Sequence, residues 1–247
     1  MMITSRKNPQ IQQLRKLISS RKERESAGLF VADGTKLFAE AVRWWDGLEQ
    51  VYYTQKAGIC VPEGVEGICV SEDIMTYISP MQTPQGALFV CRLPEKAAFA
   101  PSPGMLLLDG IQDPGNLGTI LRTADALGVQ VALLEGCADP YSHKVVRASM
   151  GAVFRTKPVQ STWQEVFAAC KIQNIPIAVT ALSDKAQDIR NARLNTMAVV
   201  IGSEGQGVRQ QILDAAQGEL IIPMNPNCES LNAAVAATIV MWQMKNA

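Results

Sequence analysis

The second half of the chain carries five short apolar runs in which polar and apolar residues do not alternate. They are MLLLD (105–109), VQVALLE (129–135), IPIAVTAL (175–182), MAVVIG (197–202) and GELIIPM (218–224). Strands that helices cover on both faces read as continuous apolar runs, and such strands pair in parallel. Helical patterns lie between the runs, so the sequence predicts an α/β domain built on a mostly parallel sheet.

The first part of the chain predicts a smaller α/β domain. It opens with an Asn-Pro helix start at Asn8, and short strand and helix patterns then alternate to about residue 93. The stretch PEKAAFAPSPG (94–104) has three prolines and little periodicity, which is typical of a linker. We therefore expect one domain over 1–95 and another over 105–247, joined by a linker over 96–104.

Net charge says nothing about partners, because 23 Lys and Arg balance 23 Asp and Glu. The basic residues are nevertheless clustered. One cluster near the amino terminus includes Arg6, Lys7, Arg15 and Lys16, and a second over 141–158 contains Lys144, Arg147, Arg155 and Lys157 without any acid. Local basic patches can bind a polyanion such as RNA, although each patch taken alone fits a solvated face equally well.

Cysteine and histidine usage disfavours several kinds of site. The six cysteines form no C-x-x-C pair and His143 is the only histidine, so we expect no metal site and no His-based catalytic triad. In the absence of a secretory signal, the cysteines fit reduced thiols in a cytoplasmic protein. The longest apolar-and-small run, 233–240, is shorter than the roughly 20 residues that cross a bilayer, so we expect no membrane span.

Three polar clusters follow predicted strands in the second half of the chain. The first contains Asn116 and Arg122, the second contains Glu204 among glycines, and the third contains Ser230 and Asn232. Ligands of open α/β sheets bind outside the carboxyl ends of the strands, so these clusters could converge on one crevice. The alternatives are that the first two clusters are ordinary glycine turns, with Arg122 a surface charge, and that the third is only the capped start of a core helix. Nothing would then be bound at any of them.

The helices that follow these clusters have predicted starting points. We expect the first helix to begin near Gly118 or Thr119, which places Arg122 in its first turn. We expect the second to begin near Val208, and the third around Ser230, with Ser230 as its cap.

The fingerprints of phosphate-bound nucleotides are missing. DGIQDPGNLGTILRTADALG followed by VQVALLEG has the outline of a βαβ unit, but it lacks the glycine spacing G-x-G-x-x-G. The phosphate-loop pattern G-x-x-x-x-G-K-[ST] is absent too. A nucleoside-like ligand without phosphate therefore fits these loops better than a dinucleotide. A nicotinamide-dependent oxidoreductase is the alternative that the missing fingerprint disfavours.

The segments DPGNLGTILRTADALG, IGSEGQGV and IPMNPNCESLNAAVAATI resemble, in order and spacing, the three motifs of the SpoU/TrmH-type RNA 2′-O-methyltransferases of the SPOUT superfamily. FVADGTKLFAEAV and SPMQTPQGALFV are similar to the RNA substrate-binding domain often fused to them. The chain departs from the usual motifs at Asp33, where Glu is common, at Pro226, where Gly is common, and at Ala233 and Ala234, where Val and Ser are common.

The resemblance implies a carboxyl-terminal trefoil-knot methyltransferase domain, a smaller amino-terminal RNA-binding domain and a homodimer. It implies that S-adenosyl-L-methionine contacts Gly202, Ile222 and Leu231, and that the catalytic group comprises Asn116, Arg122, Glu204, Ser230 and Asn232. The expected RNA contacts are Arg6, Lys7, Arg15, Lys16, Lys144 and Arg147.

The implied reaction is methyl transfer to a ribose 2′-hydroxyl, with ribosomal RNA expected ahead of transfer RNA. A guanidinium holds its proton strongly and is a poor base, so we expect Arg122 to bind the substrate phosphate and stabilise the developing alkoxide, with proton acceptance as the alternative. The alternative is an RNA-binding protein with an inactive methyltransferase site.

Overall fold

The computed structural model describes residues 2–96, 98–225, 227–228 and 230–246. Within the described part, the chain forms two compact units. The first unit is Met1–Glu95 with Asp139–Arg155, and the second is Lys96–Ala138 with Thr156–Ala247. Ala97 of the predicted linker and Pro226 of the third motif lie outside the described residues.

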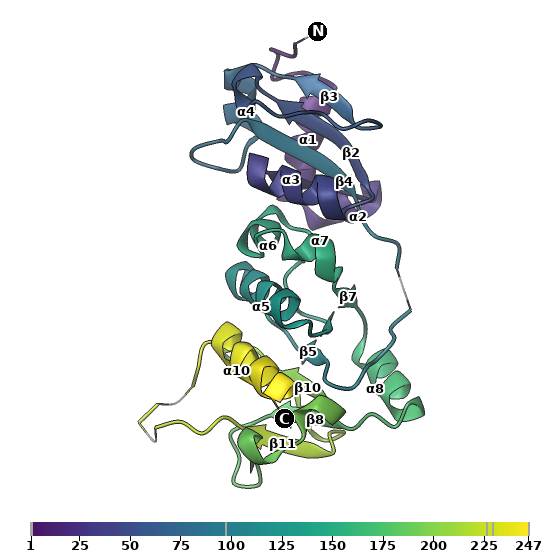
Figure 1. Cartoon of the computed structure of the whole chain (residues 1–247), viewed down its shortest axis with the longest axis vertical. Helices are drawn as coiled ribbons and strands as arrows, with labels where there is room; N and C mark the ends of the chain where they lie inside the picture. Colours follow the sequence, from purple (N-terminus) through teal and green to yellow (C-terminus); the bar gives the residue numbers. More distant parts are fainter. Residues whose placement is uncertain (1, 97, 226, 229, 247) are drawn as a thin grey trace. The chain divides into compact units, whose positions relative to one another are not determined.

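The first unit is built on a four-stranded mixed sheet in the order β1-β4-β2-β3 (Figure 1). Its strands are β1 (Leu29–Asp33), β2 (Leu48–Tyr53), β3 (Glu66–Cys69) and β4 (Ala87–Arg92). Strand β4 is antiparallel to β1 and β2, whereas β2 and β3 are parallel. The helical segments are α1 (Pro9–Ser19), α2 (Arg21–Ala27), α3 (Thr35–Trp44), η1 (Gln55–Ala57) and α4 (Glu72–Ile78).

The amino-terminal helix begins as the sequence predicts but does not continue unbroken. The Asn8 side chain accepts from the backbone N–H of Gln10, and Pro9 occupies the first helical position. The helix ends at Ser19, because Ser20 has an extended backbone, and the Ser20 side chain caps α2 by accepting from the Glu23 N–H. A capping serine in the middle of a helical pattern therefore divides it into two helices.

The segment Asp139–Arg155 packs within the first unit, although the chain enters it from β6 of the second. It forms α6 (His143–Ala148) and begins α7 (Ala152–Thr156). An aromatic cluster joins the segment to β1 and to the residue that follows α3. It is made by Phe30, Trp45, Tyr141 and Phe154.

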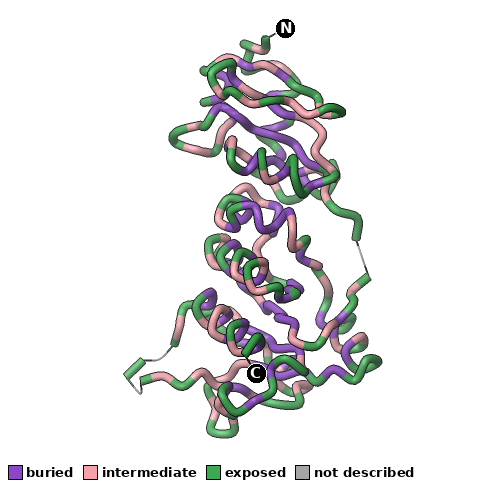
Figure 2. Tube along the Cα trace, viewed as in Figure 1, coloured by how far each residue is buried: buried purple, intermediate pink, exposed green. Residues whose placement is uncertain are grey.

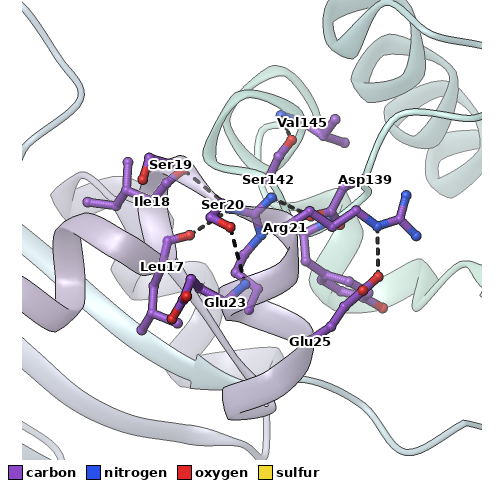
Figure 3. Close-up of polar contacts among 12 residues, drawn as sticks. Leu17, Ile18, Ser19, Ser20, Arg21, Glu23, Glu25, Asp139, Ser142 and Val145 are labelled. Carbon is purple, nitrogen blue, oxygen red and sulfur yellow. Dashed lines mark hydrogen bonds and ion pairs between the residues drawn. The ribbon is translucent and has the colours of Figure 1, made fainter.

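A buried ion pair also joins the segment to α2. The Arg24 guanidinium donates to Asp139 Oδ2 at 2.6 Å and to the Leu17 carbonyl at 2.6 Å, and the two charged side chains are 6% and 12% exposed. Figure 3 shows this region together with the exposed Arg21–Glu25 pair on the same helix.

The second unit is a seven-stranded sheet in the order β7-β6-β5-β10-β8-β11-β9, and every described pairing in it is parallel. This confirms the sheet that the apolar runs predict. The strands are β5 (Leu106–Leu108), β6 (Val131–Leu133), β7 (Val159–Gln160), β8 (Ile177–Thr180), β9 (Gln187–Asp188), β10 (Ala198–Ile201) and β11 (Gly218–Ile221). The two-residue strands β7 and β9 are not predicted by the sequence.

The helices of the second unit cover strands whose side chains are buried. These helices are α5 (Pro114–Leu127), α8 (Trp163–Ile172), η2 (Ile189–Asn191), η3 (Leu194–Thr196), α9 (Gln210–Leu213) and α10 (Ala233–Asn246). All residues of β5, β6 and β10 are buried (Figure 2). Helices α5 and α10 pack against each other, and Lys245 Nζ donates to the Gly128 carbonyl at the end of α5.

Candidate active site

The loop after β10 is a tight turn that needs glycine. Ser203 and Gly207 exchange backbone hydrogen bonds of 3.1 and 3.0 Å, which closes the loop on itself. A Cβ atom on Gly202 would lie 2.1 Å from the Gly207 carbonyl carbon and 2.3 Å from the Val208 nitrogen. Any side chain at position 202 would therefore displace backbone, so the glycine is required by the fold of the loop.

This loop borders a cavity of about 700 Å³, the main cavity. Predicted site residues from the second and third motifs line it, namely Gly202, Glu204, Ile222, Ser230 and Leu231. A volume of about 300–1,000 Å³ is typical of small-molecule and cofactor sites. The tertiary structure therefore places all three expected cofactor contacts around one space of suitable size.

Three predicted catalytic residues are hydrogen-bonded to one another through their side chains. Asn232 Nδ2 donates to Asn116 Oδ1 at 3.0 Å, and Asn116 Nδ2 donates to Glu204 Oε1. We call these three residues the polar triad. They come from the three separate motifs: Glu204 follows Asn116 by 88 positions, and Asn232 follows it by 116. The side chains thus join all three motifs, whereas the main cavity is lined by residues of the second and third motifs alone.

The direction of hydrogen bonding in the polar triad is set at both ends. Asn232 Oδ1 accepts from the backbone N–H groups of Ala234 at 2.9 Å and Val235 at 3.3 Å, so its amide nitrogen remains to donate. The Glu204 carboxylate accepts from the Asn116 amide and so ends the series. Asn116 between them has its oxygen toward Asn232 and its nitrogen toward Glu204.

Two expected helix starts are wrong. Helix α5 begins at Pro114, not near Gly118, because the Asp113 side chain accepts from the Asn116 N–H and caps it. Asn116 therefore lies in the first turn and Arg122 in the third. Helix α10 begins at Ala233, and the capping oxygen belongs to Asn232, not to Ser230.

The polar triad does not include Arg122 or Ser230. Arg122 is exposed on α5 and has no hydrogen-bond or ion-pair partner among the described residues. It is also absent from the described lining of the main cavity. Ser230 is exposed and lies on the cavity wall.

Other residues that line the main cavity were not predicted from the sequence. They include Thr180 at the end of β8, Ser183 after it, and Glu219 on β11, whose carboxylate accepts from the Ser183 hydroxyl. The one signal in the sequence for Thr180 and Ser183 is their position at the end of a predicted strand, β8, where ligands of α/β sheets bind. The signal was insufficient, because only the strand order shows that β8 lies between β10 and β11.

A second polar network lies at the ends of β5 and β6. The Arg209 guanidinium donates to Asp109 at 2.6 Å and to Glu135 at 2.9 Å, and Asp109 is only 1% exposed. Burial on its own raises the pKa of Glu135, but hydrogen bonds from Arg209 and backbone groups outweigh it, so the pKa is lowered. Glu135 is therefore ionised at neutral pH.

The expected RNA-binding residues all belong to the first unit and are exposed. Arg6 pairs with Asp73 at 2.6 Å, and the guanidinium groups of Arg6 and Arg15 lie 4.9 and 4.3 Å from the centre of the Tyr77 ring. Arg147 on α6 contacts Met81. The two basic clusters are well separated in sequence, yet all their members except Lys157 belong to one compact unit.

The described residues include no group of His, Cys, Asp and Glu side chains that could hold a metal ion. None of the helices in the described part of the chain has the length and apolar character that crossing a membrane requires. All six cysteines are free thiols.

Two family models match the chain. The model described as the SpoU rRNA Methylase family matches residues 103–242, and the MRM3-like substrate binding domain matches residues 8–88. The two matches together span most of the chain.

Curated proteins and solved structures match over nearly the full length. The chain is 31% identical over 246 residues to the Bacillus subtilis 23S rRNA (guanosine(2553)-2′-O)-methyltransferase RlmP, covering 98% of each. It is 32% identical to a crystallised RNA 2′-O ribose methyltransferase, with a TM-score of 0.81 over 100% of this chain and 98% of that one. The AdoMet-bound rRNA methyltransferase from Sinorhizobium meliloti is 27% identical, with a TM-score of 0.88 over 100% and 97% of the two chains.

Proposed function

Because this chain belongs to the SpoU rRNA methylase family and is an S-adenosylmethionine-dependent RNA 2′-O-methyltransferase, we propose that the polar triad positions the ribose 2′-hydroxyl for methyl transfer. The observation that carries this proposal is the continuous hydrogen bonding from Asn232 through Asn116 to Glu204. It supplies fixed donors and acceptors next to the main cavity, which Glu204 itself lines. Such fixed orientation is a main source of rate enhancement in transfer reactions.

The main cavity is the proposed cofactor site. S-adenosylmethionine supplies a methyl group activated by a sulfonium when it is bound. Gly202, Ile222 and Leu231 would hold the adenosine part, since a glycine allows close approach to the backbone and the other two offer apolar contact. The Glu219 carboxylate on the same wall would favour the positive charge of the cofactor. Ser230 would orient the cofactor or the ribose from the exposed edge of the same cavity.

Arg122 is proposed to stabilise the alkoxide that develops on the ribose, in the site of a second protomer. Its exposure and its lack of partners among the described residues support a role outside the polar triad of its own chain. Helix α10 also presents Val235 and Trp242, seven positions apart and 47% and 60% exposed, as an apolar stripe. We propose that this stripe contributes to a homodimer interface.

The first unit is the proposed RNA-binding part of the molecule. Arg6, Lys7, Arg15, Lys16, Lys144 and Arg147 would contact RNA phosphates. We propose a division at the linker 96–104, with 105–247 as the methyltransferase domain and with 139–155 contributing to RNA binding because it packs with the first unit. The trefoil knot implied by the family resemblance stays a prediction.

The proposed substrate is a guanosine of 23S ribosomal RNA, the substrate named for the Bacillus subtilis relative. Free cysteine thiols support a cytoplasmic location, where such RNA is found. The test is to map 2′-O-methyl groups in ribosomal and transfer RNA from cells with and without this gene. We expect one ribosomal site to disappear and to return when the purified protein and S-adenosylmethionine are added. Unchanged maps in both RNA classes would contradict the proposal.

A further inference from the structure

A small cavity of about 200 Å³ lies at the carboxyl ends of three adjacent strands, β6, β5 and β10. Ser203, Gln206 and Gly207 line it, and the same three residues line the main cavity. The loop after β10 is thus a shared wall. A group in the small cavity would lie next to a cofactor in the main cavity, with only this loop between them.

Backbone without side chains forms much of the small cavity. Gly110, Gly136 and Gly207 line it with φ angles of 69°, 86° and 67°, the left-handed conformation that favours glycine. A Cβ on Gly136 would lie 3.4 Å from the Gly110 Cα, so these two peptide segments are closely apposed. Bare peptide planes of this kind can accept the face of a flat ring.

Some polar side chains of the small cavity are held by hydrogen bonds and ion pairs, and others remain available to a ligand. Glu135 accepts from Arg209 at 2.9 Å and, weakly, from the Trp163 N–H at 3.4 Å, while the buried Asp109 holds Arg209 in place. A carboxylate has about four acceptor positions, so Glu135 keeps the capacity to accept more hydrogen bonds. The side-chain amides of Gln112 and Gln206 are exposed and have no partner in the described part of the chain.

We propose that the small cavity binds the base of the target nucleotide and that this base is guanine, read by Glu135. The inference rests on the proposed methyltransferase function. Sequence-specific proteins read single-stranded RNA at the Watson–Crick edges of splayed bases. Guanine alone among the four bases presents two adjacent donors there, N1–H and N2–H₂, which match the two oxygens of an ionised carboxylate. Gln112 or Gln206 would bond the neighbouring O6.

The test compares substrates that differ only at the methylated nucleotide. A synthetic ribosomal RNA fragment would carry guanosine, inosine or adenosine there, since inosine lacks only the N2 amino group. For the wild type, we expect kcat/KM to fall about 10- to 100-fold from guanosine to adenosine and by a smaller factor to inosine. In Glu135→Gln, kcat/KM on guanosine should fall and the guanosine-to-inosine ratio should approach one.

Two controls distinguish effects on the small cavity from effects on the main cavity. Binding of S-adenosylhomocysteine should be unchanged in Glu135→Gln, because Glu135 does not line the main cavity. Gln206→Ala should raise KM for guanosine RNA, whereas Gln173→Ala, an exposed glutamine at the end of α8, should not.

Two results would overturn the inference while leaving the methyltransferase assignment intact. One is an active wild type whose mapped nucleotide is not a guanosine. The other is a folded Glu135→Gln variant that retains the full guanosine preference. A wild type without methyl transfer to any RNA would instead contradict the proposed function itself.

Discussion

The side-chain amide of Asn232 donates a 3.0 Å hydrogen bond to Asn116, although 116 positions separate the two residues. Asn232 also accepts from the first N–H groups of α10, and Asn116 lies in the first turn of α5. Two helix starts are therefore joined through their side chains beside the main cavity. Substitutions can separate the capping role of Asn232 from its role in the polar triad.

Asn232→Asp should keep α10 capped and still impair catalysis. The carboxylate retains an oxygen for the Ala234 N–H, but it cannot donate to Asn116. We expect kcat to fall at least 10-fold with little change in Tm, measured by methyl transfer and thermal unfolding. Asn232→Ala should lose activity and also about 1 kcal/mol of stability through the lost cap. Equal kcat for Asn232→Asp and the wild type would contradict the positioning role.

Gly202→Ala should disrupt the loop that borders both cavities. The new methyl group would lie 2.1 Å from backbone, so the Ser203–Gly207 turn cannot keep its geometry. We expect the Kd for S-adenosylhomocysteine to rise at least 10-fold by calorimetry, with a lower Tm. The matched control is Gly205→Ala in the same loop, where a Cβ meets no atom within 4 Å, and its Tm should stay at the wild-type value.

Mixing two inactive variants should restore activity if Arg122 acts in the partner's site. Arg122→Ala and Asn232→Asp should each be inactive as homodimers, with S-adenosylhomocysteine binding preserved in Arg122→Ala. A heterodimer of the two then contains one site with both residues intact. The expected activity approaches half of the wild-type value per heterodimer.

The outcome of this mixing experiment discriminates two arrangements. An inactive mixture, with heterodimers demonstrated by mass spectrometry, would place Arg122 in the site of its own chain. Arg193→Ala, which removes another exposed arginine of the second unit, serves as the control and should keep full activity.

Arg24→Met should destabilise the first unit strongly. It leaves the Asp139 carboxylate, which is 12% exposed, without its ion-pair partner, and breaking such a buried pair costs about 3–5 kcal/mol. Arg21→Ala on the same helix breaks a pair whose side chains are 49% and 59% exposed, and should cost less than about 1 kcal/mol. Urea unfolding measures both, and similar losses for the two variants would be inconsistent with the buried pair.

RNA affinity should depend steeply on salt through the first unit. If Lys16 and Arg147 each neutralise one phosphate, replacing both by Ala should reduce the slope of log K against log salt by about 2. Filter binding of the full-length protein to ribosomal RNA between low and moderate salt measures the slope. Lys56→Ala, where Lys56 already faces Glu72 at 3.9 Å, should change the slope less.

Several features of this fold could be predicted because their signals are local. A strand that is buried on both faces must be apolar throughout, so the five runs coincide with β5, β6, β8, β10 and β11. The two-residue strands β7 and β9 are too short to produce such a pattern. The start of α5 differs from the prediction because the glycines after Pro114 favour a turn, whereas the Asp113-Pro114 cap outweighs them.

The packing of 139–155 could not be read from its own residues. Apolar side chains such as Val146 and Phe154 predict that one face is buried, but a hydrophobic pattern does not specify its partner. The structure pairs this face with β1 and with Trp45, which follows α3, in the first unit. As a result, Lys144 and Arg147 belong to the same unit as the amino-terminal basic residues.

The sequence by itself determined the parallel α/β class, the strand-end position of the three motifs and the residue types available for chemistry, because each depends on neighbouring residues along the chain. Only the tertiary structure decided that β10 lies between β5 and β8, which brings Asn116, Glu204 and Asn232 within hydrogen-bonding distance. It alone placed Glu135 and three glycines around a second cavity. The physical reason is that strand order and long-range hydrogen bonds follow from how buried surfaces fit together, and hydrophobic burial, being non-directional, leaves that choice open until the whole unit packs.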